Sequence, residues 1–282
     1  MLTRDEENHI LTHAYVPEHI VGLMTYLCDG EPFLMDDYFG CRKNDWTILV
    51  GYPLERDFIL EKFEGVIEKI KKQIRPRTIS LIAPALPLSI STICKQSDSD
   101  HYYTLNAKKP TIPKVIQRNL KKARQTLSFE RSSSMRSAHD EVMREFIDRV
   151  NPPVRVQNLL FKMPGYIEHA DSCFVLNAWD SNDHLTAFYV VDLAARNFSN
   201  YIIGCYSKQN YVLGASDLLL FELIGMSVEY GKSYIHLGLG VNKGIRRFKE
   251  KWGARPTLRY EMCELALRKL SMWEAIKAIG KF

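Results

Sequence analysis

The sequence predicts an α/β protein of two domains, in which mixed, mostly antiparallel sheets are flanked by helices. Three observations support this prediction. The chain has 282 residues, which exceeds an average domain. A strand, an amphipathic helix and a second strand follow one another between residues 47 and 86, which is the core of an α/β unit. Three strand-like runs separated by turn residues lie between residues 173 and 207, which indicates an antiparallel meander.

The composition is typical of a folded chain, with 46% hydrophobic and 25% charged residues. The formal net charge of +5 permits an anionic partner such as a nucleotide cofactor, RNA or a lipid head group, and equally permits a basic solvated surface. The six cysteines form no CxxC pair and no cluster with histidine, so we expect buried free thiols rather than disulfides or a metal site. The first 15 residues are polar, and no apolar run could span a bilayer, so we expect a cytoplasmic protein.

Residues 1–107 are expected to form the first domain. Short apolar pieces broken by turn residues predict strands up to about Leu54, and Pro53 ends the last of them because it cannot donate to a ladder. Apolar side chains at three- and four-residue steps predict an amphipathic helix over 55–74, and a buried strand follows it. No glycine-rich loop precedes this helix, so we expect a structural role for the domain.

Residues 108–282 are expected to form the second domain, and the proline-bearing segment KKPTIP places the boundary near Lys108. The domain opens with a basic helix, KVIQRNLKKARQTL, whose charges fit either a solvated face or a surface that faces phosphate or RNA. A strand, a second amphipathic helix and a helix broken at Pro164 then lead into the meander. A last amphipathic helix is expected from residue 266 to the C-terminus.

A small-residue loop and a buried helix follow the meander and indicate a place where an anion could bind. Gly214, Ala215 and Ser216 are small enough for the backbone to approach a ligand closely. Ser216 or Asp217 can cap the helix, whose first N–H groups and dipole favour negative charge. The same pattern is also typical of an ordinary capped helix in a core.

The next strand, YIHLGLG, contains His236 and ends in glycines. A lone histidine on a strand is commonly structural, but its ordinary pKa suits acid–base catalysis if the ring faces a cleft. The segment VNKGIRRFKEKWGARP then predicts a short basic helix. Its basic side chains fit a solvated face or the phosphates of a donor, a task for which arginine is well suited.

Taken in order, the meander, loop, helix, strand and FKEKWGARP resemble the GNAT superfamily of acyltransferases, in particular the FemAB-like proteins and the acyltransferase domain of phosphatidylglycerol lysyltransferases. The likeness covers nearly the whole chain and implies two GNAT-like domains in tandem, with a donor cleft in the second. The segments that carry the resemblance are GYPL at 51–54, LIAP at 81–84, RNLKKAR at 118–124, LNAWD at 176–180, GASDLL at 214–219 and LGLGVNKGIRRFKEKWGA at 237–254.

One motif departs from the pattern of the GNAT enzymes that use acetyl-CoA. Those enzymes carry a Q/R-x-x-G-x-G/A loop before the long helix, whereas this chain has QNYVLGAS, with Gln209 five residues before Gly214. The resemblance therefore leaves two donors open, acyl-CoA and aminoacyl-tRNA. FemAB-like relatives use aminoacyl-tRNA, and the lysyltransferases pass an amino acid from tRNA to a lipid. The implied acceptor is an amine or hydroxyl on a small molecule, a peptide or a lipid head group.

We therefore expect an N-acyltransferase of the GNAT type without a metal, which needs a held donor, an oriented acceptor and a proton acceptor. The candidates for acid–base chemistry or for orienting the acceptor are His236, Asp217, Glu222 and Tyr206. The candidates for binding the donor are Leu213, Gly214, Ala215, Ser216, Asn242, Lys243, Arg246 and Arg247.

Two alternatives remain open from the sequence. An aminoacyl-tRNA-dependent transferase is favoured if the basic helix and the 243–251 cluster share one surface. A non-catalytic binding protein on a degenerate GNAT scaffold is favoured if a side chain such as Tyr211 plugs the cleft beside Gly214.

Overall fold

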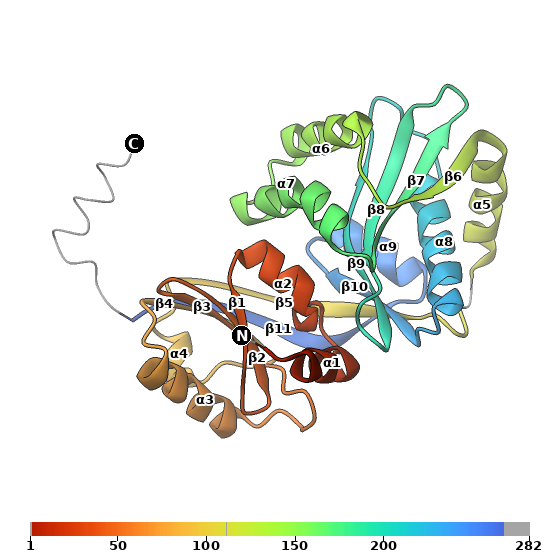
Figure 1. Cartoon of the computed structure of the whole chain (residues 1–282). Helices are drawn as coiled ribbons and strands as arrows, with labels where there is room; N and C mark the ends of the chain where they lie inside the picture. Colours follow the sequence, from red (N-terminus) through yellow and green to blue (C-terminus); the bar gives the residue numbers. More distant parts are fainter. Residues whose placement is uncertain (1, 111, 268–282) are drawn as a thin grey trace, which may run out of the picture. The chain divides into compact units, whose positions relative to one another are not determined.

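The computed structural model describes residues 2–110 and 112–267, which form two compact units (Figure 1). Of the described residues, the first unit contains Cys28–Ser99 and residues 259–267, and the second contains Thr3–Leu27 and Asp100–Leu258. The division into domains 1–107 and 108–282 stays a prediction, because contact density separates compact units and does not by itself delimit duplicated modules. The helix expected from residue 266 lies almost wholly outside the described residues.

The first unit is a mixed sheet with the strand order β1-β2-β3-β4-β11. Strands β3 and β4 pair in parallel, and the other neighbours pair antiparallel. The predicted amphipathic helix is confirmed as α3, which buries one apolar stripe in the core of this unit. The elements are β1 (Glu31–Met35), β2 (Tyr38–Lys43), β3 (Trp46–Val50), α3 (Leu60–Gln73), β4 (Thr78–Ala83), α4 (Leu88–Ser91), the beginning of β5 (Gln96–Asn106) and most of β11 (Arg255–Ala266).

The cysteines correct one expectation. Cys94 and Cys263, which are 169 residues apart, form a disulfide within the first unit. The prediction of free thiols was wrong for this pair, because spacing along the chain does not reveal that residues following α4 lie beside β11. The other four cysteines, Cys28, Cys41, Cys173 and Cys205, are buried and lie outside any disulfide, as expected.

The second unit has the strand order β5-β10-β9-β8-β7-β6. The predicted meander is confirmed as the antiparallel strands β7, β8 and β9, and β10 joins β9 in parallel. The elements in chain order are α1 (Arg4–His13), η1 (Pro17–His19), α2 (Val21–Cys28), the later part of β5, α5 (Lys114–Thr126), β6 (Leu127–Ser132), α6 (Ser137–Val150), α7 (Val154–His169), β7 (Cys173–Asp180), β8 (Leu185–Asp192), β9 (Phe198–Tyr206), α8 (Ala215–Glu229), β10 (Tyr234–Leu239), α9 (Lys243–Lys251) and the beginning of β11.

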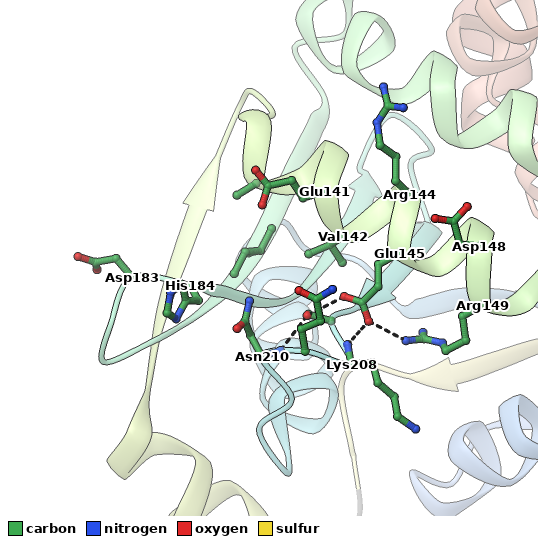
Figure 2. A pocket seen from close by; sticks show the side chains of 14 residues that line it. Glu141, Val142, Arg144, Glu145, Asp148, Arg149, Asp183, His184, Lys208 and Asn210 are labelled. Carbon is green, nitrogen blue, oxygen red and sulfur yellow. Dashed lines mark hydrogen bonds and ion pairs between the residues drawn. The ribbon is translucent and has the colours of Figure 1, made fainter.

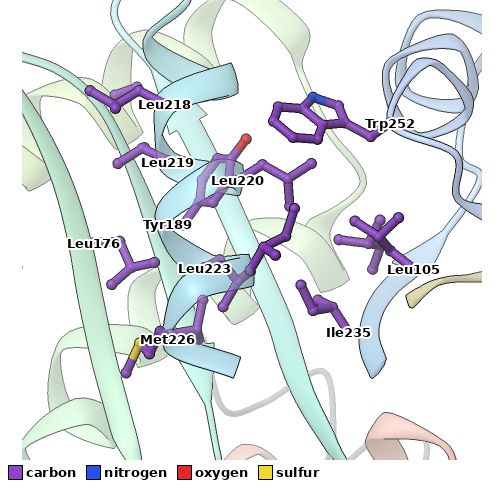
Figure 3. Packing of buried hydrophobic residues seen from close by; sticks show 14 of the residues in the cluster. Leu105, Leu176, Tyr189, Leu218, Leu219, Leu220, Leu223, Met226, Ile235 and Trp252 are labelled. Carbon is purple, nitrogen blue, oxygen red and sulfur yellow. The ribbon is translucent and has the colours of Figure 1, made fainter. Parts of the chain in front are cut away.

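Each face of this sheet carries its own core. Helices α5 and α8 cover one face, and α6 and α7 cover the other (Figure 1). Helix α8 is apolar on nearly every side because it packs against both the sheet and α5. Figure 3 shows Leu219, Leu220 and Leu223 of α8 among side chains from β5, β7, β8 and β10. Strand alternation therefore sorts the residues of β9 and β10 between these two cores.

The N-terminal residues correct a second expectation. Strands were predicted up to Leu54, but α1, η1 and α2 occupy most of the first 28 residues. Helix α1 begins with a capping box in which Thr3 Oγ1 accepts from Glu6 N (3.2 Å) and Glu6 Oε2 accepts from Thr3 N (2.7 Å). Helix α2 is short and apolar all round, so its sequence has no periodicity that separates a helix from a strand.

Helix α7 was predicted to break at Pro164, and it runs through that residue to His169. The mixed-sheet α/β fold class as a whole is confirmed. Within residues 2–110 and 112–267, every helix is too short or too polar to cross a bilayer.

Candidate functional site

The candidate site lies where β9 and β10 separate in the second unit. The two strands pair in parallel at Tyr234–Phe198, Ile235–Ser199 and His236–Asn200. Among the described residues the ladder between the two strands ends at this last pair, although β9 continues to Tyr206 and β10 to Leu239. A bulge between His236 and Leu239, on the β5 side of β10, accompanies the separation. The ladder therefore ends before either strand does, and an extended ligand could bind where the two strands are no longer paired.

The predicted donor loop lies at the end of β9 and leads into α8. Gly214 is the N-cap residue with φ +92°, and an added Cβ would lie 3.2 Å from the Ala123 Cβ and 3.3 Å from the Asn119 carbonyl oxygen. The glycine is thus required both by its dihedral angle and by the close approach of α5. Leu213 is exposed, Ser216 is half-buried and Ala215 is buried. The Ala215 N–H already donates to the Val212 carbonyl at 3.2 Å, so an anion could accept from the N–H groups that follow it in the first turn of α8.

Asp217, a predicted catalytic residue, joins α8 to α9. It is 4% exposed, and its carboxylate accepts from the Trp252 indole N–H (2.8 Å) and from Lys251 Nζ (2.7 Å to Oδ1). A carboxylate that receives both of these hydrogen bonds is already occupied as an acceptor. We therefore assign Asp217 to the packing of the two helices and not to proton transfer.

Glu222 and Tyr206, also predicted as catalytic, contact helices that cover opposite faces of the sheet. Glu222 of α8 accepts from Arg124 Nη2 of α5 at 3.1 Å. Tyr206, at the end of β9, is 40% exposed, and its ring lies under the Arg149 guanidinium of α6 at 4.5 Å. The fold does not bring these two candidates together. Of the two, only Tyr206 lies on β9, one of the two strands that separate at the candidate site.

His236 is fully buried in the last pair of the β9–β10 ladder. Its Nδ1 accepts from the Gly238 backbone N–H at 3.2 Å, and its ring packs edge-on against Tyr102, with centroids 4.9 Å apart. Burial, with a smaller contribution from the Lys249 charge, lowers the pKa of His236 to about 3. The ring is therefore neutral at physiological pH.

The residues predicted to bind the donor from the β10–α9 segment have separate roles. Asn242 caps α9, since its Oδ1 accepts from Ile245 N at 3.0 Å. Arg246 pairs with Asp100 at 3.4 Å. Lys243 and Arg247 are exposed on α9. Lys243 and Arg247 could therefore bind a phosphate while Asn242 keeps its capping bond and Arg246 keeps its ion pair.

Sequence reasoning missed Lys249, which is buried at the end of β10. Its Nζ donates to the Leu239 carbonyl at 2.6 Å and lies 5.6 Å from the centre of the Tyr103 ring. Burial lowers the pKa of Lys249 to about 7, and the neighbouring Asp100 opposes this shift. The only signal in the sequence was its place in the predicted basic helix.

Sequence reasoning also missed a pocket of about 870 Å³ on the α6 face, beside the loop that follows β9 (Figure 2). Glu145 of α6 holds this loop, because its carboxylate accepts from the Ser207 hydroxyl (2.8 Å) and from Lys208 N. Arg149 donates to the same carboxylate at 3.2 Å. Side chains of both charges line the pocket, among them Glu141, Asp148 and Asp183 on the acidic side and Arg144, Arg149 and Lys208 on the basic side.

Comparison with known proteins gives matches in structure only. Neither the family models nor the curated protein sequences contain a match to this chain. The C-terminal domain of a candidate lysylphosphatidylglycerol synthetase from Agrobacterium fabrum aligns with a TM-score of 0.61 at 14% identity, over 98% of this chain and 94% of that one. FemX aligns with a TM-score of 0.59 at 9% identity, over 93% and 96%.

A tandem GNAT protein from the clavulanic acid biosynthesis pathway aligns with a TM-score of 0.53 at 8% identity, over 95% of this chain and 97% of that chain. At such low identities these likenesses concern the fold. The fold of this chain is therefore that of the GNAT-fold proteins, as the resemblance in its sequence predicted.

Proposed function

We propose that this chain is an acyltransferase of the GNAT type, which transfers an acyl or aminoacyl group to an amine or hydroxyl acceptor. The observation that supports this most is the early end of the β9–β10 ladder at Asn200, on the strand whose far end leads into the α8 N-terminus. An extended donor could bind between the strands, with its phosphates at the first N–H groups of α8. Lys243 and Arg247 would add positive charge nearby.

The reaction forms a bond between the acceptor nitrogen or oxygen and the donor carbonyl carbon, and it breaks the donor's thioester or ester bond. The acceptor proton passes to a base, and the leaving thiolate or alkoxide takes up a proton. Among the four predicted candidates we place proton transfer at Tyr206. Asp217 and Glu222 are engaged by cations, and His236 is buried and neutral.

Equilibrium binding tests this proposal. We expect saturable binding of at least one acyl-CoA or charged tRNA, and weaker binding of the same donor after its acyl bond is hydrolysed. Ser216→Glu should weaken binding at least tenfold, because a carboxylate at the α8 N-terminus repels the donor phosphates. Val228→Glu is the charge-matched control on the exposed surface of the same helix. Absence of binding across both donor classes would contradict the proposal.

A second candidate, an aminoacyl-tRNA-dependent transferase, is favoured by the position of α5. Asn119 and Ala123 of α5 lie against Gly214, so this basic helix borders the α8 N-terminus. Its exposed Arg118, Lys121 and Lys122 line a hollow of about 420 Å³. An RNA strand that leaves the donor site could follow this surface. Binding of charged tRNA should then fall steeply as salt rises from 50 to 200 mM. In an Arg118→Ala/Lys122→Ala variant, the slope of log K against log salt concentration should be smaller in magnitude by roughly one to two.

The third possibility, a degenerate scaffold without activity, depended on Tyr211 closing the site. Tyr211 is 57% exposed, and its ring meets the Tyr206 ring edge-on, with ring centroids 6.0 Å apart. Its exposed position gives that possibility no support.

A further inference from the structure

Asn200 and His236 form the most buried polar pair at the point where β9 and β10 separate. They are direct partners in the last pair of the parallel ladder, so their side chains leave the sheet on the same face, next to each other. Asn200 is 1% exposed and His236 is 0% exposed. Phe198 and Tyr102 pack on the imidazole, with centroids 5.6 Å and 4.9 Å away, and hold the ring in place.

Both side chains carry hydrogen-bonding atoms that the described residues do not satisfy. The Asn200 amide has no partner within residues 2–110 and 112–267 at either Nδ2 or Oδ1, and the same is true of His236 Nε2. Native proteins rarely leave buried polar atoms unpaired, because desolvation without a compensating hydrogen bond costs stability. Two such side chains side by side indicate that a polar group binds between them.

The protonation state of His236 defines the chemistry of that group. A backbone N–H can only donate, so the 3.2 Å contact from Gly238 N requires a lone pair on His236 Nδ1. A neutral imidazole then carries its proton on Nε2, which makes Nε2 a donor. The bulged backbone at Gly238, with φ +70°, directs the N–H that fixes this tautomer. The group bound at His236 must therefore present an oxygen acceptor, and a cationic ammonium could not serve.

We propose that Asn200 and His236 bind a polar oxygen on the acyl group of the donor, such as a hydroxyl, so that the transferred group is a hydroxyacyl or similarly polar acyl group rather than an aliphatic one. This inference rests on the proposed function, because it places the acyl group at the end of the β9–β10 ladder. The His236 N–H donates to the oxygen, and the Asn200 amide can donate to it or accept from its proton. An aliphatic acyl group would leave three buried polar atoms unpaired, so the site discriminates against it.

Isosteric donor pairs test this inference. 3-Hydroxybutyryl-CoA and isovaleryl-CoA differ by a hydroxyl in place of a methyl group, and threonyl-tRNA and valyl-tRNA differ in the same way. We expect the hydroxyl-bearing member of at least one pair to bind at least tenfold more tightly. In Asn200→Leu the preference should shrink to about twofold or reverse, while binding of the aliphatic member is kept or improved.

The outcomes separate the inference from the proposed function. Equal binding of both members of each pair by the wild-type protein keeps the proposed function and overturns the inference. Binding of neither donor class overturns both. The melting temperature of Asn200→Leu without donor is a second measurement, because an isosteric apolar residue should leave it unchanged or raise it. A lower melting temperature combined with an unaltered donor preference would mean that Asn200 and His236 bind a structural water, which would overturn the inference.

Discussion

Lys249 and His236 are two buried basic side chains at the end of β10, and both have pKa values well below their ordinary ranges. For single residues such as these, the sequence indicates which side chain is present but not whether it is buried or what it contacts. His236 could be singled out because it stands alone in an apolar strand. Asn200 could have been noticed only as a polar residue at a position that strand alternation buries. The role of Asp217 could not be read at all, because it depends on Trp252, 35 residues further along the chain.

The pKa of Lys249 predicts how stability depends on pH. Between about pH 7 and the ordinary lysine pKa of 10.5, Lys249 is neutral in the folded state and protonated in the unfolded state. The unfolded state then binds more protons, so the free energy of unfolding rises with pH through this window. Lys249→Met should flatten that rise, as measured by urea unfolding between pH 7 and 9.5. The control is the exposed Lys243→Met, and equal slopes in the wild type and Lys249→Met would contradict the assignment.

Among the elements, long periodic helices were predictable and short apolar ones were not. Helices α3 and α5 each show apolar side chains at three- and four-residue steps against a charged face, and the structure confirms both. Helix α2 is apolar throughout, and α7 continues through Pro164 because the rest of its turns pack on the sheet. The small-residue loop before α8 was predictable as a loop, but its close contact with α5 depends on a packing partner about 90 residues earlier.

Gly214 links α8 to α5 and yields a prediction about elements. Gly214→Ala should lower the free energy of unfolding by about 1–2 kcal/mol from the left-handed dihedral alone, and by more because the methyl group meets Ala123 and Asn119 at 3.2–3.3 Å. Gly231→Ala is the matched control, since Gly231 has φ +70° and open space around its Cβ position. Chemical denaturation should show the larger loss for Gly214. Equal losses would mean that α5 moves aside at little cost.

For the whole molecule, composition and length predicted a folded core and more than one domain, but not which segments build each compact unit. The first unit takes its last strand from the C-terminal part of the chain, and the second takes its first helices from the N-terminal part. This assignment of segments to units depends on contacts between residues far apart in sequence, and the periodicity of apolar residues gives no information about such contacts. The Cys94–Cys263 disulfide is the clearest case.

The disulfide predicts that stability depends on redox conditions. Cys94→Ser should lower the free energy of unfolding of the oxidised protein by about 2–4 kcal/mol, because the bond restricts the unfolded chain over a long loop. In excess dithiothreitol the wild type and the variant should unfold at nearly the same urea concentration. A difference that persists under reducing conditions would show that the side chain at this position matters and the bond does not.

The placement of β11 has a consequence for synthesis on the ribosome. Strand β4 pairs with β11 through Ala83–Glu261 and the pairs that follow. About 180 residues separate these partners, which is roughly 10–40 s of translation at ordinary bacterial and eukaryotic rates. Throughout that interval the nascent first unit has an open sheet edge of the kind that recruits unintended partners. Newly made chains should therefore depend on chaperones until β11 has left the exit tunnel.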